Sequence, residues 1–144
     1  MATIMRKMNI ISRCEALYRT EKFSCDIPAI YHSYILCICK NPGMPQEALA
    51  RHLCINKSSV TRHIAFLEKN GYIEKRLSET DKREHLIYPT GKMLASLDEV
   101  VNITMEWNSL LADGISTEEL KLFHSIMDKM LVRSQELIKG GKED

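Results

Sequence analysis

The sequence predicts a mainly α-helical protein that carries one small β-hairpin. Apolar residues recur at helical spacing between Ile4 and Tyr18 and again through most of the last third of the chain. Between these stretches, from Ile73 to Tyr88, the apolar period shortens to two, as in strands. The 144 residues contain no apolar run of about 18 residues that could span a bilayer, so we expect one globular domain, 1–144, without a membrane partner.

Two helices are predicted in the first 40 residues. The first has a wide apolar face that extends from Ile4 to Tyr18. The second covers residues 30–39 and ends before Asn41-Pro42-Gly43, a strong helix breaker.

A third and a fourth helix follow closely. We expect Pro45 in the first turn of the third helix, where a missing N–H costs nothing. The fourth helix begins at Asn56 as N-cap and stops at Asn70-Gly71. Only a tight turn at residues 54–55 separates the two helices.

A hairpin and two further helices complete the chain. Strands over 73–77 and 83–88 are joined by the polar turn SETDK, residues 78–82. A fifth helix continues to about Leu111 and is broken at Asp113-Gly114. Ser116 and Glu119 form a capping box for a sixth helix with a long apolar seam.

The predicted pattern is typical of a winged helix-turn-helix: two short helices joined by a tight turn and followed by a hairpin with a charged tip. Val60, Ile64 and Leu67 share one face of the fourth helix and hold it to the core. From its N-terminal half we expect short polar and cationic side chains to project toward DNA: Lys57, Ser58, Ser59, Thr61, Arg62 and His63. The wing adds Arg76, Asp81, Lys82 and Arg83. The polar residues of this helix, taken alone, could also be ordinary capping residues and a solvated surface. The charged hairpin beside the helix makes DNA binding the better interpretation.

Charge is divided unevenly along the chain. Residues 1–44 and 45–92 each carry a net +3, whereas residues 93–144 carry −5. An anionic partner such as nucleic acid would therefore meet the first two-thirds of the chain.

The runs LARHLCINKSSVTRHIAFLEKNGYIEKR, 49–76, and SETDKREHLIYPT, 78–90, resemble the DNA-binding core of the MarR family of regulators. This resemblance implies a winged helix-turn-helix over 41–92 and a helical dimerisation region over 1–40 and 93–140. It also implies that Arg83 enters the minor groove and that Asp81 orients it. Pro89 and Met93 depart from the family pattern, but both lie near the start of the fifth helix, outside the DNA-reading parts.

We therefore predict a sequence-specific regulator of transcription that binds double-stranded DNA. The resemblance implies a homodimer formed by the first, fifth and sixth helices, and the wide apolar seams of the first and sixth helices support it independently. A two-fold dimer predicts a pseudo-palindromic operator. We expect repression by occupancy of the operator. The resemblance implies that it is released when a small phenolic or aromatic acid binds a cleft, for which Tyr18, Tyr31, Tyr34 and Trp107 are candidate lining residues.

Two alternatives remain open. Cys14, with Tyr18 one turn later and Tyr31 and Tyr34 in the second helix, resembles the peroxide-sensing branch of the family, and Cys25 would be its resolving thiol if it lay within disulfide reach. A winged-helix module that binds protein instead of DNA is the other alternative.

The sequence offers no other chemistry. Five cysteines, an odd number without framework spacing, indicate a reducing cytoplasm. The pairs Cys37-x-Cys39 and His52-x-Cys54 place their side chains on different helix faces, so we expect no metal site and no cofactor. No phosphate-binding loop, metalloprotease motif or nucleophile elbow occurs, so we do not expect an enzyme.

Overall fold

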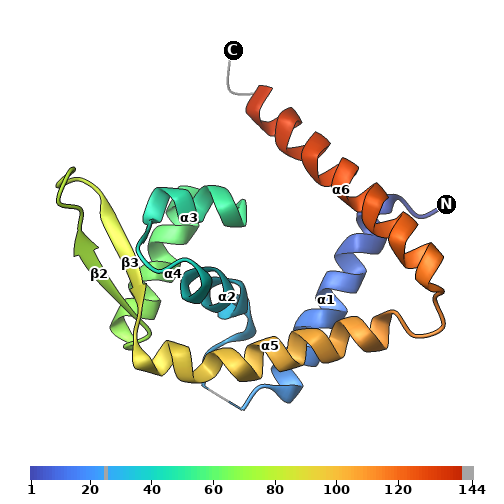
Figure 1. The fold of residues 1–144 in the computed structure, drawn as a ribbon, viewed down its shortest axis with the longest axis horizontal. Coiled ribbons are helices and arrows are strands. Elements are labelled where there is room, and N and C mark those ends of the chain that lie inside the picture. The colour runs from blue at the N-terminus through green and yellow to red at the C-terminus, as the bar shows by residue number, and fades with distance from the viewer. Residues whose placement is uncertain (25, 141–144) are drawn as a thin grey trace. The chain divides into compact units, whose positions relative to one another are not determined.

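The computed structural model describes residues 1–24 and 26–140, which form six α-helices, one short 3₁₀ helix and three strands (Figure 1). The helices are α1 (Ile4–Lys22), η1 (Ala29–Tyr31), α2 (His32–Lys40), α3 (Gln46–Leu53), α4 (Lys57–Lys69), α5 (Gly91–Leu111) and α6 (Thr117–Gly140). The strands are β1 (Met44–Pro45), β2 (Ile73–Leu77) and β3 (His85–Pro89). The predicted fold class, mainly helical with a small hairpin, is confirmed.

By contacts between its residues, the chain divides into two compact units, 1–107 and 108 onward. The first unit contains α1 to α4, the sheet and most of α5; the second contains the end of α5 and α6. The single domain expected for 1–144, with its dimerisation and DNA-binding regions, stays a prediction.

The core of the first unit lies where α2, α3 and α4 meet the sheet and the start of α5 (Figure 1). Its fully buried side chains come from α2 (Tyr34, Ile35, Ile38), α3 (Leu49), α4 (Val60, Ile64, Leu67), β3 (Ile87) and α5 (Met93, Val100). Each such aliphatic side chain contributes about 1.5–3 kcal/mol by leaving water, so this cluster holds α4 and the hairpin in place.

The turn between α3 and α4 begins at Cys54, whose φ of 53° lies in the left-handed region. The Cys54 N–H donates to the carbonyls of Ala50 and Arg51, and the Ile55 N–H donates to Ala50 at 3.1 Å. These bonds satisfy the carbonyls of Ala50 and Arg51 in the last turn of α3, so the chain can turn sharply and α4 can begin at Lys57, with Asn56 as its N-cap, as the sequence predicted.

The sheet has the order β1-β3-β2, with both pairs antiparallel. The short strand β1 was missed from the sequence, because two residues carry no measurable period. Its pairing also corrects the place of Pro45, which is the extended N-cap of α3, with ψ 145°, and not part of its first turn. The second hairpin strand begins at His85, two residues later than predicted, because Arg83 and Glu84 still belong to the turn.

Helix α6 begins as predicted from its capping box. The Glu119 N–H donates to Ser116 Oγ at 3.2 Å, and the Ser116 N–H donates to Glu119 Oε2 at 2.9 Å. These bonds favour the carboxylate and lower the pKa of Glu119. Across the described ranges 1–24 and 26–140, no helix has the length and apolar character needed to cross a membrane.

Candidate nucleic-acid interface

Helix α4 is attached to the core along one face, which leaves the opposite side of its N-terminal half exposed. Val60, Ile64 and Leu67 are buried, as predicted from their spacing. At its start, Asn56 Oδ1 accepts the Ser59 N–H at 2.8 Å, which confirms Asn56 as N-cap.

The exposed face of α4 carries short hydroxyls and two cations. Lys57, Ser58, Thr61 and Arg62 are exposed, whereas Ser59 is half-buried. Arg62 Nη2 donates to Ser59 Oγ at 3.2 Å, and the Thr61 hydroxyl donates to the Lys57 carbonyl at 2.9 Å. Lys57 Nζ lies 3.7 Å from Glu47 Oε1 with both groups in solvent, so this ion pair is weak and leaves the ammonium available.

His63 differs from these neighbours because it faces partly inward. It is half-buried, and its Nδ1 lies 2.7 Å from the hydroxyl oxygen of the fully buried Tyr34. Its ring also meets Tyr31 and Tyr34 edge-on, with centroid distances of 5.5 and 5.4 Å. Burial lowers the pKa of His63, and the charge of Arg62 lowers it further.

The tip of the wing is shaped by two side chains that bond its backbone. Ser78 is buried, and its Oγ accepts weakly from the N–H groups of Thr80 and Asp81, both at 3.4 Å. Asp81 Oδ1 accepts the backbone N–H of Arg83 at 2.9 Å. In the described part of the chain no acid lies within ion-pair distance of Lys82 or Arg83, and both are exposed.

Arg76 has a different environment from the two cations at the tip. Its Nη2 lies 3.3 Å from Glu74 Oε2, and its guanidinium lies 4.2 Å from the ring centroid of Tyr88. An Arg held by an acid and an aromatic face is less available to a phosphate than Arg83 is.

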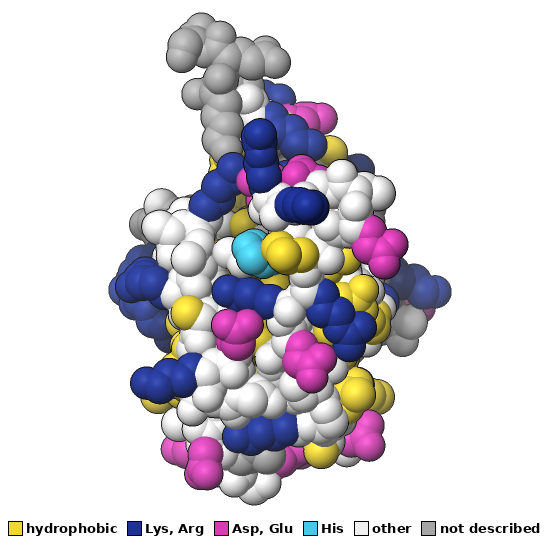
Figure 2. All heavy atoms as spheres, turned by 90° about the vertical axis from the view of Figure 1, so that its left-hand side faces the viewer, with side chains coloured by type: hydrophobic (Ala, Val, Ile, Leu, Met, Phe, Trp, Pro, Cys, Tyr) yellow, Lys and Arg dark blue, Asp and Glu magenta, His cyan; other side chains and the backbone are white. Residues whose placement is uncertain are grey.

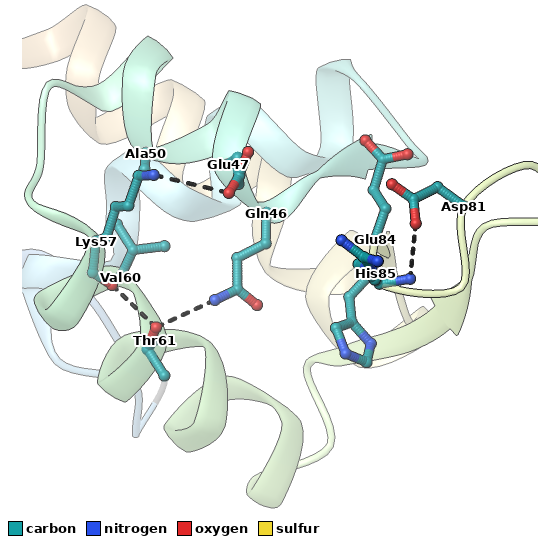
Figure 3. A pocket seen from close by; sticks show the side chains of 10 residues that line it. Gln46, Glu47, Ala50, Lys57, Val60, Thr61, Asp81, Glu84 and His85 are labelled. Carbon is teal, nitrogen blue, oxygen red and sulfur yellow. Dashed lines mark hydrogen bonds and ion pairs between the residues drawn. The ribbon is translucent and has the colours of Figure 1, made fainter.

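A groove of about 430 Å³ separates the start of α3 and the N-terminal half of α4 from the wing (Figure 3). Gln46 reaches from α3 toward α4, where its Nε2 donates to Thr61 Oγ1 at 3.3 Å (Figure 3). Three acids line the groove beside Lys57, Arg83 and His85: Glu47, Asp81 and Glu84. These carboxylates would repel phosphate, so the exposed cations Lys57 and Arg83 are better suited to contact DNA than the groove as a whole.

The same mixture of charges is visible on the molecular surface. Figure 2 looks onto the side of the molecule that carries the wing, where Lys and Arg side chains lie between Asp and Glu side chains and one histidine lies near the middle. A surface of mixed sign favours discrete contacts over a continuous basic band.

The proposed sensing residues fall into two environments. Cys14 is exposed on α1, and the Tyr18 hydroxyl donates to Glu106, which raises the pKa of Tyr18 to about 12. Tyr31 and Tyr34 instead belong to the aromatic cluster around His63. The hydroxyls of Tyr18 and Tyr34 are thus engaged by other groups and not by the Cys14 sulfur, while Cys25 lies outside the described residues.

Several residues of this interface were missed from the sequence. Ser78 could have been found, because a Ser at the start of a polar turn often bonds the backbone two or three residues on. The roles of Gln46 and of Tyr34 depend on partners 15 and 29 residues away, and no local pattern indicates them. Among the described residues, no three His, Cys, Asp or Glu side chains gather to hold a metal ion.

The profile of the MarR family matches residues 32–85, which span α2 to the start of β3. The region from α2 to the start of β3 thus belongs to the MarR family. MarR-family proteins are winged helix-turn-helix, DNA-binding regulators of transcription and not enzymes, as the sequence resemblance predicted.

Comparisons with individual proteins agree with the MarR assignment. YybA of Bacillus subtilis, described as an uncharacterized HTH-type transcriptional regulator, is 24% identical over 147 residues, covering 99% of this chain and 98% of the relative. The crystal structure of the transcriptional regulator SlyA has a TM-score of 0.91 at 22% identity, covering 98% of this chain and 100% of that one. A putative MarR-family regulator from Listeria monocytogenes, solved in complex with a 26mer DNA, has a TM-score of 0.87 at 24% identity, covering 100% and 99% of the two chains.

Proposed function

We propose that this MarR-family protein is a homodimeric repressor that binds a pseudo-palindromic site in double-stranded DNA. The observation that carries the proposal is the exposed, cation-bearing N-terminal half of α4 beside a wing tip with two unpaired cations in the described chain. Helix α4 would enter the major groove and the wing tip the minor groove. The Listeria monocytogenes relative complexed with DNA supports this assignment.

Each contact residue has a role that follows from its chemistry. Arg62 is the candidate for a bidentate contact to guanine, worth about 1–3 kcal/mol of discrimination. Lys57, Ser58, Ser59 and Thr61 would bond phosphates or base edges near the helix start, where exposed N–H groups also favour an anion. Arg83 and Lys82 at the tip would contact the minor groove, and Asp81 would hold the Arg83 backbone.

The dimer is supported by apolar side chains that this chain leaves exposed. Helix α1 has no buried residue, and it exposes Ile4, Met5, Ile10, Ile11 and Leu17. Helix α6 exposes another series, which includes Leu122, Phe123, Ile126, Leu131, Val132, Leu137 and Ile138. A second copy of the chain would remove these patches from water, and residues 1–40 and 93–140 would form the dimerisation region. Two recognition helices would then lie roughly 34–36 Å apart, matching adjacent major grooves.

The signal that we propose is a small phenolic or aromatic acid, bound where α1 meets α5. Tyr18 and Trp107 lie there with ring centroids 5.2 Å apart. Binding that changes the spacing between the wings would release the operator. A peroxide signal through Cys14 is the second candidate, favoured by the exposure of its thiol. We place this regulation in the cytoplasm, in keeping with the unpaired cysteines among the described residues.

The test is fluorescence anisotropy with labelled DNA from upstream of the protein's own gene, at two salt concentrations. Affinity should fall steeply as salt rises, because phosphate contacts release counterions. Arg83→Ala should weaken binding to many sequences alike, whereas Arg62→Ala should mainly relax base preference. Lys69→Ala, which removes an exposed cation from the last turn of α4, away from the proposed contacts and from the dimerisation region, is the control and should bind as the parent does.

Three experimental outcomes would contradict part of this proposal. If the parent and both interface variants bind equally, neither arginine contacts DNA. If no salt-sensitive binding occurs with any upstream fragment, a winged-helix module that binds protein becomes the better assignment. Release by hydroperoxide, reversed by a thiol reductant, together with no effect of salicylate, would replace the phenolic signal with Cys14 oxidation.

A further inference from the structure

His63 is held in one orientation by an aromatic cage that connects α2 with the recognition helix. Tyr34 lies below it with an exposed fraction of 0%, and the Tyr34 hydroxyl oxygen is 2.7 Å from His63 Nδ1. Tyr31 and Tyr34 present their rings to the imidazole at interplanar angles of 84° and 88°. Tyr31 in turn stacks on Phe66, with centroids 4.6 Å apart and planes inclined by 4°. The imidazole therefore has little freedom to rotate or flip.

This bond decides which ring nitrogen carries the proton. Burial raises the pKa of Tyr34 to about 12, so its hydroxyl keeps its proton near neutral pH. Burial and Arg62 lower the pKa of His63, so the imidazole is neutral there. If Nδ1 carried the proton, the hydroxyl hydrogen of Tyr34 would be buried without an acceptor, which is costly. The favoured arrangement has Tyr34 donating to Nδ1, with the imidazole proton on Nε2.

The other nitrogen, Nε2, reaches solvent. Among the described residues, the buried side-chain nitrogens that lack a partner are Nε of Arg19 and both ring nitrogens of His32. His63 Nε2 is not one of these atoms, and within the described ranges it has no hydrogen-bond partner in the protein. It is thus an open donor on α4, adjacent to the exposed Arg62.

We propose that Tyr34 fixes His63 in its Nε2–H form and that His63 donates this proton to a phosphate oxygen of the DNA. This inference rests on the proposed DNA-binding function. His63 lies at the border between the buried and exposed faces of α4, so its short side chain is placed to reach the flanking backbone more readily than a base edge. A phosphate oxygen also makes the stronger bond, because it is anionic. Tyr34 acts as a positioning residue, and His63 is the contact residue.

Two substitutions of His63 separate its proposed contact with DNA from its hydrogen bond to Tyr34. His63→Asn places an amide near the position of Nδ1, so it can keep a bond to Tyr34 but loses the distal donor. His63→Gln places its amide nitrogen near the position of Nε2, so it can keep the distal donor but loses the bond to Tyr34. We expect His63→Asn to weaken DNA binding about tenfold per half-site, and His63→Gln to stay within about twofold of the parent.

Thermal stability should follow the opposite order. The His63→Gln variant should melt at a lower temperature than His63→Asn, because it leaves the Tyr34 hydroxyl buried without its partner. The slope of log affinity against log salt should be the same in His63→Asn and the parent, because a neutral donor releases no counterion. Arg83→Ala, by contrast, removes a charge at the DNA backbone and should reduce that slope.

The role of Tyr34 is tested by measuring which ring nitrogen of His63 carries the proton. Two-bond ¹H–¹⁵N spectra of the parent, labelled at histidine nitrogen, should show the Nε2–H pattern for His63. Tyr34→Phe should convert it to a mixture of tautomers and weaken DNA binding, whereas Tyr31→Phe should leave both unchanged. Tyr31→Phe is the matched control, because Tyr31 stacks on Phe66 and its hydroxyl has no hydrogen-bond partner among the described residues.

The failure of this inference is distinguishable from that of the proposed function. If the parent binds DNA but His63→Asn and His63→Gln bind equally, or if the Gln variant binds more weakly than the Asn variant, the phosphate contact is refuted while the repressor proposal stands. An Nδ1–H pattern in the parent refutes the part assigned to Tyr34. A parent that shows no salt-sensitive DNA binding refutes the proposed function and the phosphate contact together.

Discussion

Asp81 offers the sharpest test of how the wing is organised. The family resemblance implies that this residue orients Arg83, and an ion pair with the guanidinium would be the simplest means. In the structure, however, Asp81 Oδ1 accepts the backbone N–H of Arg83 at 2.9 Å, and the Asp81 carbonyl accepts the Glu84 N–H at 3.0 Å. We therefore predict that Asp81 acts through the backbone of the turn, and that an uncharged acceptor can replace it.

Asp81→Asn and Asp81→Ala both remove the carboxylate charge, but only Asn keeps an acceptor oxygen. A single hydrogen bond of this kind contributes about 0.5–1.5 kcal/mol, and it is lost in the Ala variant alone. Both variants gain equally from reduced repulsion, which is about 0.5 kcal/mol for a carboxylate about 8 Å from a phosphate in water. The ratio of the two affinities therefore isolates the hydrogen bond, and it should be about two- to tenfold per wing in favour of Asn.

The assay is anisotropy with one operator fragment at one salt concentration, so that screening is constant. Asp81→Asn should bind as tightly as the parent or slightly more tightly, and Asp81→Ala should bind more weakly than Asp81→Asn. Equal affinities of the two variants, both below that of the parent, would mean that the carboxylate charge holds the Arg83 side chain. The reasoning from the backbone bond would then be wrong.

Three further outcomes follow from the fold. Gly43→Ala should lower the free energy of unfolding more than Gly71→Ala does. Both positions have a positive φ, which costs roughly 1–2 kcal/mol for Ala, but only at Gly43 would the new Cβ lie 3.0 Å from the Tyr88 hydroxyl oxygen. Equal urea midpoints of the two variants would contradict this prediction. His32 is 1% exposed, and its burial, reinforced by the charge of Arg19, lowers its pKa from 6.5 to about 4. As the pH drops, the unfolded chain therefore binds a proton at this histidine before the folded chain does. The free energy of unfolding should fall by up to about 3 kcal/mol between pH 6.5 and pH 4. His32→Leu should reduce that loss, and identical melting curves against pH in parent and variant would exclude the effect. Asn56→Ala should cost about 1 kcal/mol by removing the N-cap of α4, whereas Asn56→Asp, which keeps the acceptor, should retain the parental urea midpoint.

Much of the candidate interface was predictable because its signals are local. The cap at Asn56, the buried spacing of Val60, Ile64 and Leu67, and the polar turn of the wing all act between residues a few positions apart. The capping box of α6 was predictable for the same reason. Strand β1 was not predictable, because its two residues adopt the extended form only when β3 lies beside them.

The sequence by itself determined the order of helices and hairpin, the start of α4 and the cations of its exposed face, since caps, turn residues and apolar periods depend on near neighbours. Only the tertiary structure decided that His63 bonds Tyr34, 29 residues away, and that Arg76 lies over Tyr88 while Arg83 stays unpaired in the described chain. These contacts join residues that are distant in sequence. Their geometry depends on how α2, α4 and the hairpin pack, and that is set by the shared core and not by any local pattern.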